Sequence, residues 1–113
     1  MSGPVVEVVV FRLNEGVGTE QFERAAAASA SFIEALPGFQ GRELLRPGPV
    51  REGGEAGAAW VDIVHWASLE VAESAGAAVM ESASCAEMMS AIDEESVQML
   101  HLHTSAVSSA TAA

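Results

Sequence analysis

The sequence predicts a single α+β domain in which an antiparallel sheet carries helices on one of its faces. Four short stretches are rich in valine and other residues that favour strands, and two longer segments repeat apolar residues at helical spacing. The helical segments follow the first and the third of the strand-forming stretches, which gives the order β-α-β-β-α-β. We expect residues 1–106 to form the domain and residues 107–113 to be a disordered tail.

The first strand and the first helix are indicated by contrasting patterns. Residues 5–13, "VVEVVVFRL", are β-branched or apolar at odd and even positions alike, which predicts a strand that is buried on both faces. Residues from about 20 to 36 repeat apolar side chains at helical spacing, and Thr19 is placed to cap the start of this helix. The "PG" dipeptide at residues 37–38 ends it.

A hairpin is expected to follow. Residues 39–47, "FQGRELLRP", form the second strand, and residues 58–66, "AAWVDIVHW", form the third. Between them, the glycine-rich and charged residues 48–57 predict a long, mobile hairpin loop.

The remainder of the chain is predicted to hold two helices and the last strand. Ser68 is placed to cap a helix over about 69–80. Ser84 and Glu87 have the spacing of a capping box, which would open a short helix that runs to about residue 91. Residues 96–107, "SVQMLHLHTSAV", are expected to form the last strand.

This order of elements is the split β-α-β, or ferredoxin-like, arrangement. The first and third strands carry apolar residues on both of their faces, whereas a single layer of helices covers only one face of the sheet. An apolar sheet face that is left uncovered is a partner site, and a second copy of the chain is the simplest cover. The sequence therefore predicts a homodimer.

Charge and composition exclude several classes of partner. The formal net charge is −11, and the basic residues are five arginines with no lysine, so nucleic acid and anionic membrane surfaces are not expected partners. No apolar run approaches a membrane span, and no basic region precedes the apolar residues near the N-terminus, so we expect a soluble, cytoplasmic protein. A single cysteine excludes an intrachain disulfide and a cysteine-rich zinc site.

Several segments of the chain are similar to those of a known superfamily. They are "VVEVVVFRL", "FIEALPGFQGREL", "WVDIVHWASLEVAESA" and the alanine-rich segment around Cys85 that leads to the last strand. In these segments, which together cover residues 5–105, the chain resembles the dimeric α+β barrel superfamily, and within it the antibiotic-biosynthesis-monooxygenase-like domains. The resemblance implies a dimeric α/β barrel with a pocket between the sheet of each subunit and its own helices. Members include cofactor-free monooxygenases, heme-degrading enzymes and decarboxylases, among which fold alone does not choose.

The resemblance also bears on particular residues. Trp66 matches a tryptophan at the end of a strand that lines this pocket in several relatives. Cofactor-free, quinone-forming members place an asparagine four residues before that tryptophan, where this chain has Asp62, and they also use a tyrosine, which this chain lacks. Heme-degrading relatives use a histidine on the following helix, and residues 69–80 contain none, so we do not expect heme degradation.

Three side chains are candidates for acid–base catalysis: Asp62, His65 and His101. Histidine exchanges protons near neutral pH, and a carboxylate can accept a phenolic proton. Because side chains alternate along a strand, Trp60, Asp62 and Trp66 share one face of the third strand, while His65 lies on the other face with Val61 and Ile63. We expect the pocket to be lined by Phe11, Trp60, Trp66, Met88 and Met89.

A metal site is the alternative role for the histidines. His101 and His103 lie two residues apart, and therefore on the same face of the last strand, with His65 or Glu7 on neighbouring strands as a third ligand. Ordinary hydrogen bonds account for such half-buried histidines more simply. We therefore predict neither a metal nor a cofactor.

Two functions remain open on the sequence alone. The first is a small oxidoreductase, a cofactor-independent monooxygenase that acts on an aromatic, polyketide-like or quinol-like molecule able to activate oxygen itself. The second is a non-catalytic protein that binds a small apolar ligand or serves as a stress-related dimer. The absence of tyrosine and the aspartate in place of asparagine keep the two hypotheses level.

Overall fold

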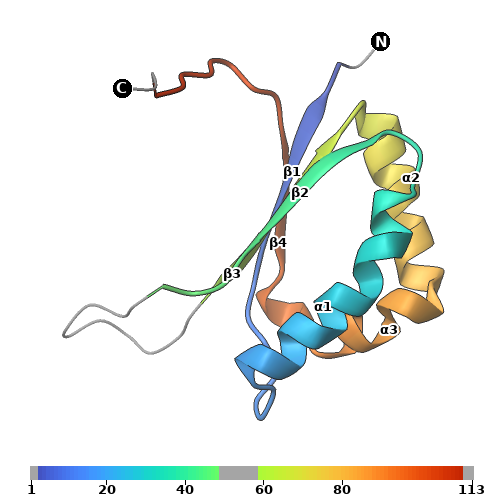
Figure 1. The fold of residues 1–113 in the computed structure, drawn as a ribbon, viewed down its shortest axis with the longest axis vertical. Helices are drawn as coiled ribbons and strands as arrows, with labels where there is room; N and C mark the ends of the chain where they lie inside the picture. Colours follow the sequence, from blue (N-terminus) through green and yellow to red (C-terminus); the bar gives the residue numbers. More distant parts are fainter. Residues whose placement is uncertain (1–2, 49–58, 111–113) are drawn as a thin grey trace.

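The strands and the helices form two layers, with the sheet on one side of the molecule and the helices on the other (Figure 1). The computed structural model describes residues 3–48 and 59–110. The elements, in chain order, are β1 (Val5–Phe11), α1 (Thr19–Glu34), β2 (Phe39–Leu45), β3 (Trp60–Trp66), α2 (Leu69–Glu81), α3 (Ala83–Ser90), the 3-10 turn η1 (Glu94–Ser96) and β4 (Gln98–Leu102).

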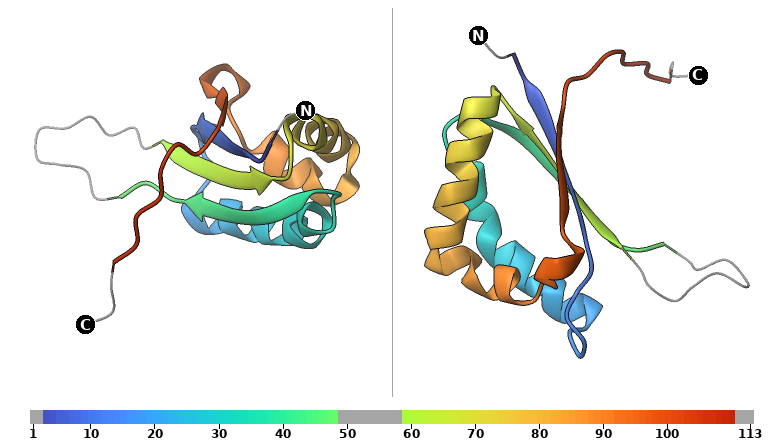
Figure 2. Two further views of the ribbon diagram at one scale, coloured as in Figure 1. Left: turned by 90° about the horizontal axis from the view of Figure 1, so that it is seen from above. Right: turned by 180° about the vertical axis from the view of Figure 1, so that it is seen from behind.

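The sheet has the strand order β2-β3-β1-β4, and every neighbouring pair is antiparallel. Strands β1 and β3 are central, while β2 and β4 form the edges. Figure 2 shows from above and from behind that α1, α2 and α3 all lie on the same side of the sheet. The predicted ferredoxin-like α+β fold, with its helices on one face, is therefore confirmed.

The pairing register assigns each strand residue to one of two faces. Val5 lies opposite Trp66, Phe11 lies opposite Trp60, and all four side chains are buried. Side chains of this parity point towards the helices, and we call their side of the sheet the inner face; the opposite side is the outer face. The inner face consists of Arg42 and Leu44 on β2; Trp60, Asp62, Val64 and Trp66 on β3; Val5, Glu7, Val9 and Phe11 on β1; and Met99 and His101 on β4.

An aromatic cluster forms the part of the core that lies near the start of α1. Phe22 of α1 packs edge-on against Trp60, with ring centroids 4.8 Å apart, and lies 5.5 Å from Phe11. Phe11 and Trp60 are stacked at 6.5 Å. Each ring is nearly fully buried, so this cluster fixes α1 to the centre of the sheet.

Two predicted helix caps are wrong by one or two residues. Thr19 is the first helical residue of α1, and its N-cap is Gly18, which has no side chain to offer. The short helix α3 begins at Ala83, and the hydroxyl of Ser82 accepts a hydrogen bond from the Ser84 N–H. Ser82, and not Ser84, is therefore the N-cap of α3. The same serine is the C-cap of α2, which ends at Glu81.

The strands are shorter than predicted. β1 ends at Phe11, and Leu13 forms an isolated bridge with Ile92. β4 spans only Gln98–Leu102 of the expected 96–107. Most of the predicted hairpin loop at 48–57, and the end of the predicted tail at 111–113, lie outside the described residues.

The outer face is apolar and no element of the described chain covers it. It carries Val6, Val8 and Val10 of β1, Val61 and Ile63 of β3, and Leu100 and Leu102 of β4. Leu100 and Leu102 are 52% and 46% exposed, and Met99 on the inner side of the same edge strand is exposed as well. Within the described residues, no helix combines the length and the apolar composition that a membrane crossing requires.

Gly38 provides a test of how tightly the layers pack. Its φ is +81°, and a Cβ atom there would lie 2.5 Å from Val71 Cγ2 on α2. We expect Gly38→Ala to lower the free energy of unfolding by about 2–4 kcal/mol, because left-handed backbone costs an alanine about 1 kcal/mol and overpacking adds about 1–3 kcal/mol. Chemical denaturation measures the loss.

Gly16→Ala is the matched control for this prediction. Gly16 also has a positive φ, +89°, but a Cβ atom there meets nothing within 4 Å. Gly16→Ala should lower the free energy of unfolding only by the cost of the left-handed backbone, about 1 kcal/mol. Equal losses in the two variants would contradict the close approach of α2 to Gly38.

Candidate functional site

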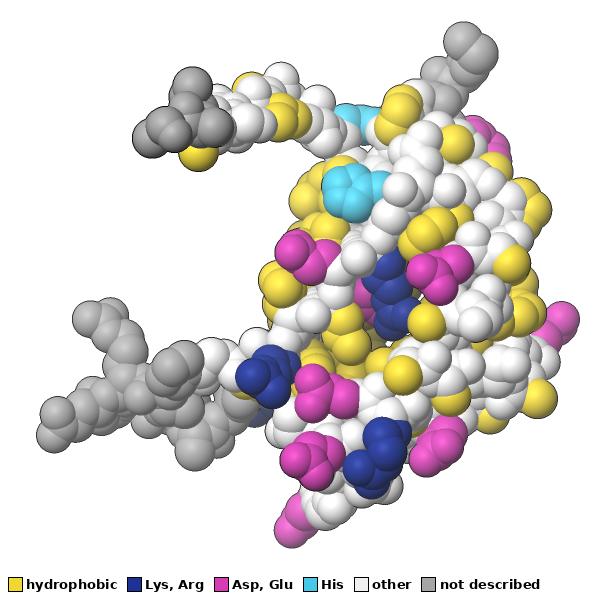
Figure 3. Space-filling model, viewed as in Figure 1, with side chains coloured by type: hydrophobic (Ala, Val, Ile, Leu, Met, Phe, Trp, Pro, Cys, Tyr) yellow, Lys and Arg dark blue, Asp and Glu magenta, His cyan; other side chains and the backbone are white. Residues whose placement is uncertain are grey.

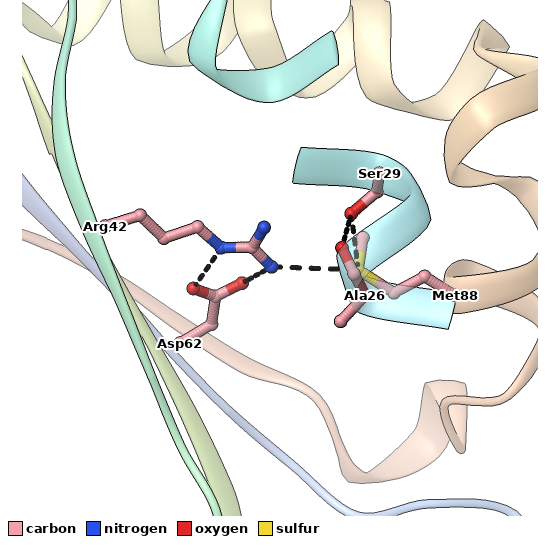
Figure 4. Close-up of polar contacts among 5 residues, drawn as sticks. All are labelled: Ala26, Ser29, Arg42, Asp62 and Met88. Carbon is pink, nitrogen blue, oxygen red and sulfur yellow. Dashed lines mark hydrogen bonds and ion pairs between the residues drawn. The ribbon is translucent and has the colours of Figure 1, made fainter. Parts of the chain in front are cut away.

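The inner face carries an ion pair in the space between the sheet and the helices (Figure 4). Arg42 Nε donates a hydrogen bond of 2.9 Å to Asp62 Oδ1, and Nη2 donates one of 2.8 Å to Oδ2. The side chains are 12% and 17% exposed, so the pair is largely withdrawn from solvent. Two parallel hydrogen bonds of this kind hold a guanidinium in one orientation.

The helices contact this pair through a methionine. Arg42 Nη2 lies 3.7 Å from Met88 Sδ on α3, and the buried Ser29 Oγ on α1 lies 3.3 Å from the same sulfur. The Ser29 hydroxyl also lies 2.6 Å from the Ala26 carbonyl oxygen, which is the stronger acceptor for its one proton. Arg42 Nη1, by contrast, has no hydrogen-bond partner among the described residues, so its two N–H groups are free to donate.

A second polar pair lies on the inner face towards the β4 edge. His101 Nε2 is 2.9 Å from Glu7 Oε1, across the β1–β4 ladder in which these residues are direct partners. Their side chains are 26% and 14% exposed. A carboxylate that holds one imidazole nitrogen fixes the ring and leaves Nδ1 facing away from the pair. Such a held histidine is arranged as a general base.

The two pairs share one row across the sheet. Arg42 is opposite Val64, Val64 is opposite Glu7, and Glu7 is opposite His101. With strands about 4.8 Å apart, the Cα atoms of Arg42 and His101 are about 14 Å apart. Long side chains at both ends narrow that gap, and the side chain of Val64 between them is buried in the core.

Trp66 adds an unsatisfied donor beside this row. Its indole Nε1 is buried and has no hydrogen-bond partner among the described residues. An unpaired buried donor costs about 1–3 kcal/mol. Trp66 is a diagonal neighbour of Arg42 across β2 and β3, and its ring meets Phe39 edge-on at 5.8 Å. A ligand with an acceptor oxygen would satisfy the indole N–H.

The structure separates the predicted site residues into three places. Asp62, His101, Trp66 and Met88 lie around the inner-face row, and the half-buried Met89 packs against the core nearby. Phe11 and Trp60 belong to the aromatic cluster, where Trp60 is six residues, or about 20 Å, from Trp66 along β3. His65 is exposed on the outer face, as the alternation predicted.

Arg42 was missed in the sequence, although it is the partner of Asp62. Its inward orientation depends on an irregularity between Phe39 and Gly41, which shifts the alternation of β2 by one residue. From Arg42 onward, Arg42 and Leu44 share the inner face. The available signal was that Arg42 lies two residues from Leu44, an apolar inner-face position. The bulge that decides which face Arg42 occupies is not evident in "FQGRELL".

The histidines of β4 have separate hydrogen-bond partners. His103 Nδ1 lies 3.0 Å from the Pro4 carbonyl oxygen, whereas His101 contacts Glu7. Over residues 3–48 and 59–110, no three histidine, cysteine or acidic side chains converge as metal ligands would. His103 and His65 line a cavity of about 300 Å³ together with Gln40 and Thr104, at the end of the sheet near Pro4.

The space-filling view shows how the polar groups are distributed (Figure 3). Basic and acidic side chains lie in a hollow between the sheet and the helices, with hydrophobic side chains around them. The charged groups of the inner face are thus reachable by a small molecule, because each of the four side chains keeps part of its surface exposed.

Solved structures with low sequence identity share this fold. SnoaB, a cofactor-independent oxygenase from Streptomyces nogalater, is 16% identical with a TM-score of 0.67, over 94% of this chain and 97% of SnoaB. A dimeric ferredoxin-like protein of unknown function from Thermobifida fusca is 12% identical with a TM-score of 0.65, over 92% and 93%. A heme-degrading protein from Mycobacterium tuberculosis is 24% identical with a TM-score of 0.57, over 97% and 100%.

These likenesses define the class of fold. The chain has the ferredoxin-like α+β fold found in antibiotic-biosynthesis-monooxygenase-like domains, as the sequence resemblance implied. No family model and no curated protein matches the chain. At this level of identity the fold is shared, and the chemistry has to be argued from the residues of the inner face.

A double-mutant cycle tests the ion pair on which the site is built. Arg42→Met leaves the Asp62 carboxylate unpaired, and we expect it to lower the free energy of unfolding by about 2–3 kcal/mol. Asp62→Leu leaves the Arg42 guanidinium unpaired and should lower the free energy of unfolding by about as much. The double variant should recover most of the loss, because no charge is then left alone; strictly additive losses would contradict a coupled pair.

Proposed function

We propose that this protein is a small, cofactor-independent monooxygenase that acts on a phenolic or enolisable aromatic molecule bound between the sheet and the helices. The observation that carries the proposal is the guanidinium of Arg42, which Asp62 holds with its Nη1 donors free, in the same row as the His101–Glu7 pair. One group receives a developing oxyanion and the other takes the proton. SnoaB, which has the same fold, is a cofactor-independent oxygenase.

His101 is the general base in this proposal. Glu7 holds Nε2 and leaves Nδ1 for the substrate proton, and the edge position of β4 gives the imidazole access to solvent. Asp62 is a positioning residue, since both of its oxygens already accept hydrogen bonds from Arg42. His65 lies on the other side of the sheet and takes no part.

Arg42 and Trp66 stabilise the anion that forms when the proton leaves. Arg42 Nη1 offers two charge-assisted donors, and the indole N–H of Trp66 offers a neutral one. Both are buried enough for the surroundings to strengthen the interaction. The tyrosine that related oxygenases use is replaced here by a charged donor, which suits a substrate that reacts as its anion.

The reaction balances with oxygen as the only co-substrate. His101 removes a proton from an activated CH₂ or phenol, and the resulting anion passes one electron to O₂. The radical and superoxide combine to a peroxide, which regains the proton from the histidine. Loss of water from the peroxide then forms the carbonyl, so that R₂CH₂ and O₂ give R₂C=O and H₂O. The substrate is the reductant throughout.

The active form in this proposal is a cytoplasmic homodimer that packs through the outer face. That face exposes apolar residues of β1 and β3 and the leucines of β4, and no element of the described chain packs against them. A second copy provides one through a two-fold axis. Dimeric proteins of the same fold support this assembly.

A binding protein without catalytic activity is the second candidate. The full engagement of Asp62 with Arg42 favours it, because that aspartate stands where quinone-forming relatives have an asparagine. Both candidates use the same inner-face donors to hold an aromatic ligand. They differ only in whether oxygen is consumed.

Oxygen uptake with dihydroxynaphthalene or anthrone distinguishes the two candidates. We expect uptake above background, and His101→Gln should lower the rate by about 100-fold or more, because the base is lost. His65→Gln is the matched control and should leave the rate unchanged. Binding of the phenol without uptake would establish the second candidate, and equal losses in both variants would refute the assignment of His101.

The outer face can be tested by placing a charge on it. Leu100→Glu should convert the dimer to a monomer at micromolar concentration, because burying an unpaired carboxylate in an apolar interface is costly. Met80→Glu is the control, since Met80 is 68% exposed but lies on α2, away from the sheet. Size-exclusion chromatography with light scattering measures both. A Leu100→Glu protein that stays dimeric would contradict packing through this face.

A further inference from the structure

A cavity of about 480 Å³ lies beside the start of α1, at the end of the sheet where β1 and β2 end and β3 begins. We infer that this cavity binds the carboxylate end of an aromatic molecule. The inference deepens the proposed function, on which it rests, by naming the substrate class as an aromatic acid. The charge of the cavity, the way its wall is held and its contact with Trp60 support this inference.

The cavity is basic in a protein that is strongly acidic. Arg12 and Arg46 both line it, although the whole chain has only five arginines. None of the described residues that line it is acidic, although the chain has 16 aspartates and glutamates. On a surface of net charge −11, this is where an anion is attracted instead of repelled.

Both guanidinium groups are available to a ligand. The Arg12 side chain has no hydrogen-bond or ion-pair partner among the described residues. Arg46 has one distant partner, Glu23, with 3.9 Å between Nη1 and Oε2 and both groups well exposed. Such an exposed ion pair contributes little and is easily exchanged for a better-placed carboxylate.

The backbone behind Arg12 is held in place. Its N–H donates to Ser96 Oγ at 2.8 Å, and its carbonyl oxygen accepts from the Asp93 N–H at 2.9 Å. Asn14 is fixed as well, because its Nδ2 donates to the Ser90 carbonyl oxygen at 2.9 Å. The rim therefore presents Arg12 from a fixed position, which reduces the ordering cost of binding.

The rest of the cavity suits an aromatic body. Trp60, Leu13 and Val17 supply its apolar wall, and Thr19 adds a hydroxyl at the first turn of α1. A volume of this size accommodates a small ligand. The guanidinium groups at the rim and the indole in the wall match a molecule that is aromatic at one end and anionic at the other.

Trp60 belongs both to the wall of the cavity and to the inner face of β3. Trp60 and Asp62 are consecutive inner-face residues of β3, about 7 Å apart along the strand. An aromatic acid with its carboxylate between Arg12 and Arg46 places its ring against the wall that contains Trp60. In this arrangement the carboxylate supplies binding energy at the two arginines.

Titration of ¹⁵N-labelled protein with 2-naphthoate tests this subsite. The two tryptophan indole N–H signals distinguish the two ends of β3. We expect the Trp60 signal to shift on binding, and the neutral analogue 2-naphthamide to bind at least about tenfold more weakly. The double variant Arg12→Gln/Arg46→Gln should weaken naphthoate binding by a similar factor, about tenfold, without weakening naphthamide binding.

Arg24→Gln is the matched control, because Arg24 is an exposed arginine of α1 that does not line the cavity. It should leave naphthoate binding unchanged. The subsite is refuted if the amide binds as tightly as the acid, if Arg24→Gln weakens binding as much as the double variant, or if Trp60 does not shift. Loss of oxygen uptake with this binding intact would instead refute only the monooxygenase. Uptake with neutral phenols and no naphthoate binding would refute only the subsite.

Discussion

The ion pair between Arg42 and Asp62 constrains the rest of the structure. Its two opposite charges lie on the inner face, where most of their surface is shielded from solvent. Each charge therefore needs the other, and the pair needs a polar or adaptable neighbour above it. Met88 of α3 provides that neighbour with its polarisable sulfur, and Ser29 of α1 contacts the same atom. These contacts fix the helices over the pair.

Strand alternation then divides the protein into two surfaces with different tasks. The inner face combines the charged row with Trp66, and these are groups that act on a small molecule. The outer face is dominated by valine, isoleucine and leucine, which suit a flat protein contact, and it also carries His65. A seven-residue strand such as β3 serves both surfaces at once, with Asp62 on one and Ile63 on the other.

The sequence predicted the order of elements, the face of each residue in β3 and the uncovered apolar face, because these follow from period-two and helical patterns. It placed the caps of α1 and α3 one and two residues too late, because α1 begins after Gly18 without a side-chain cap and Ser82 caps α3. The sequence did not predict the Arg42–Asp62 pair, for a different reason. A bulge in β2 sets the register, and one shifted residue decides whether an arginine faces solvent or a buried carboxylate.

A crystal structure of the protein with dihydroxynaphthalene bound is the most direct test that the inner face holds the ligand. The account predicts the aromatic ring at the inner-face row, with one oxygen within about 3 Å of Arg42 Nη1 and the other hydroxyl at the imidazole of His101. The outer face should be covered by a second copy of the chain. A ligand seated on the outer face, or an inner face that stays closed over Arg42 while the phenol binds elsewhere, would contradict the account.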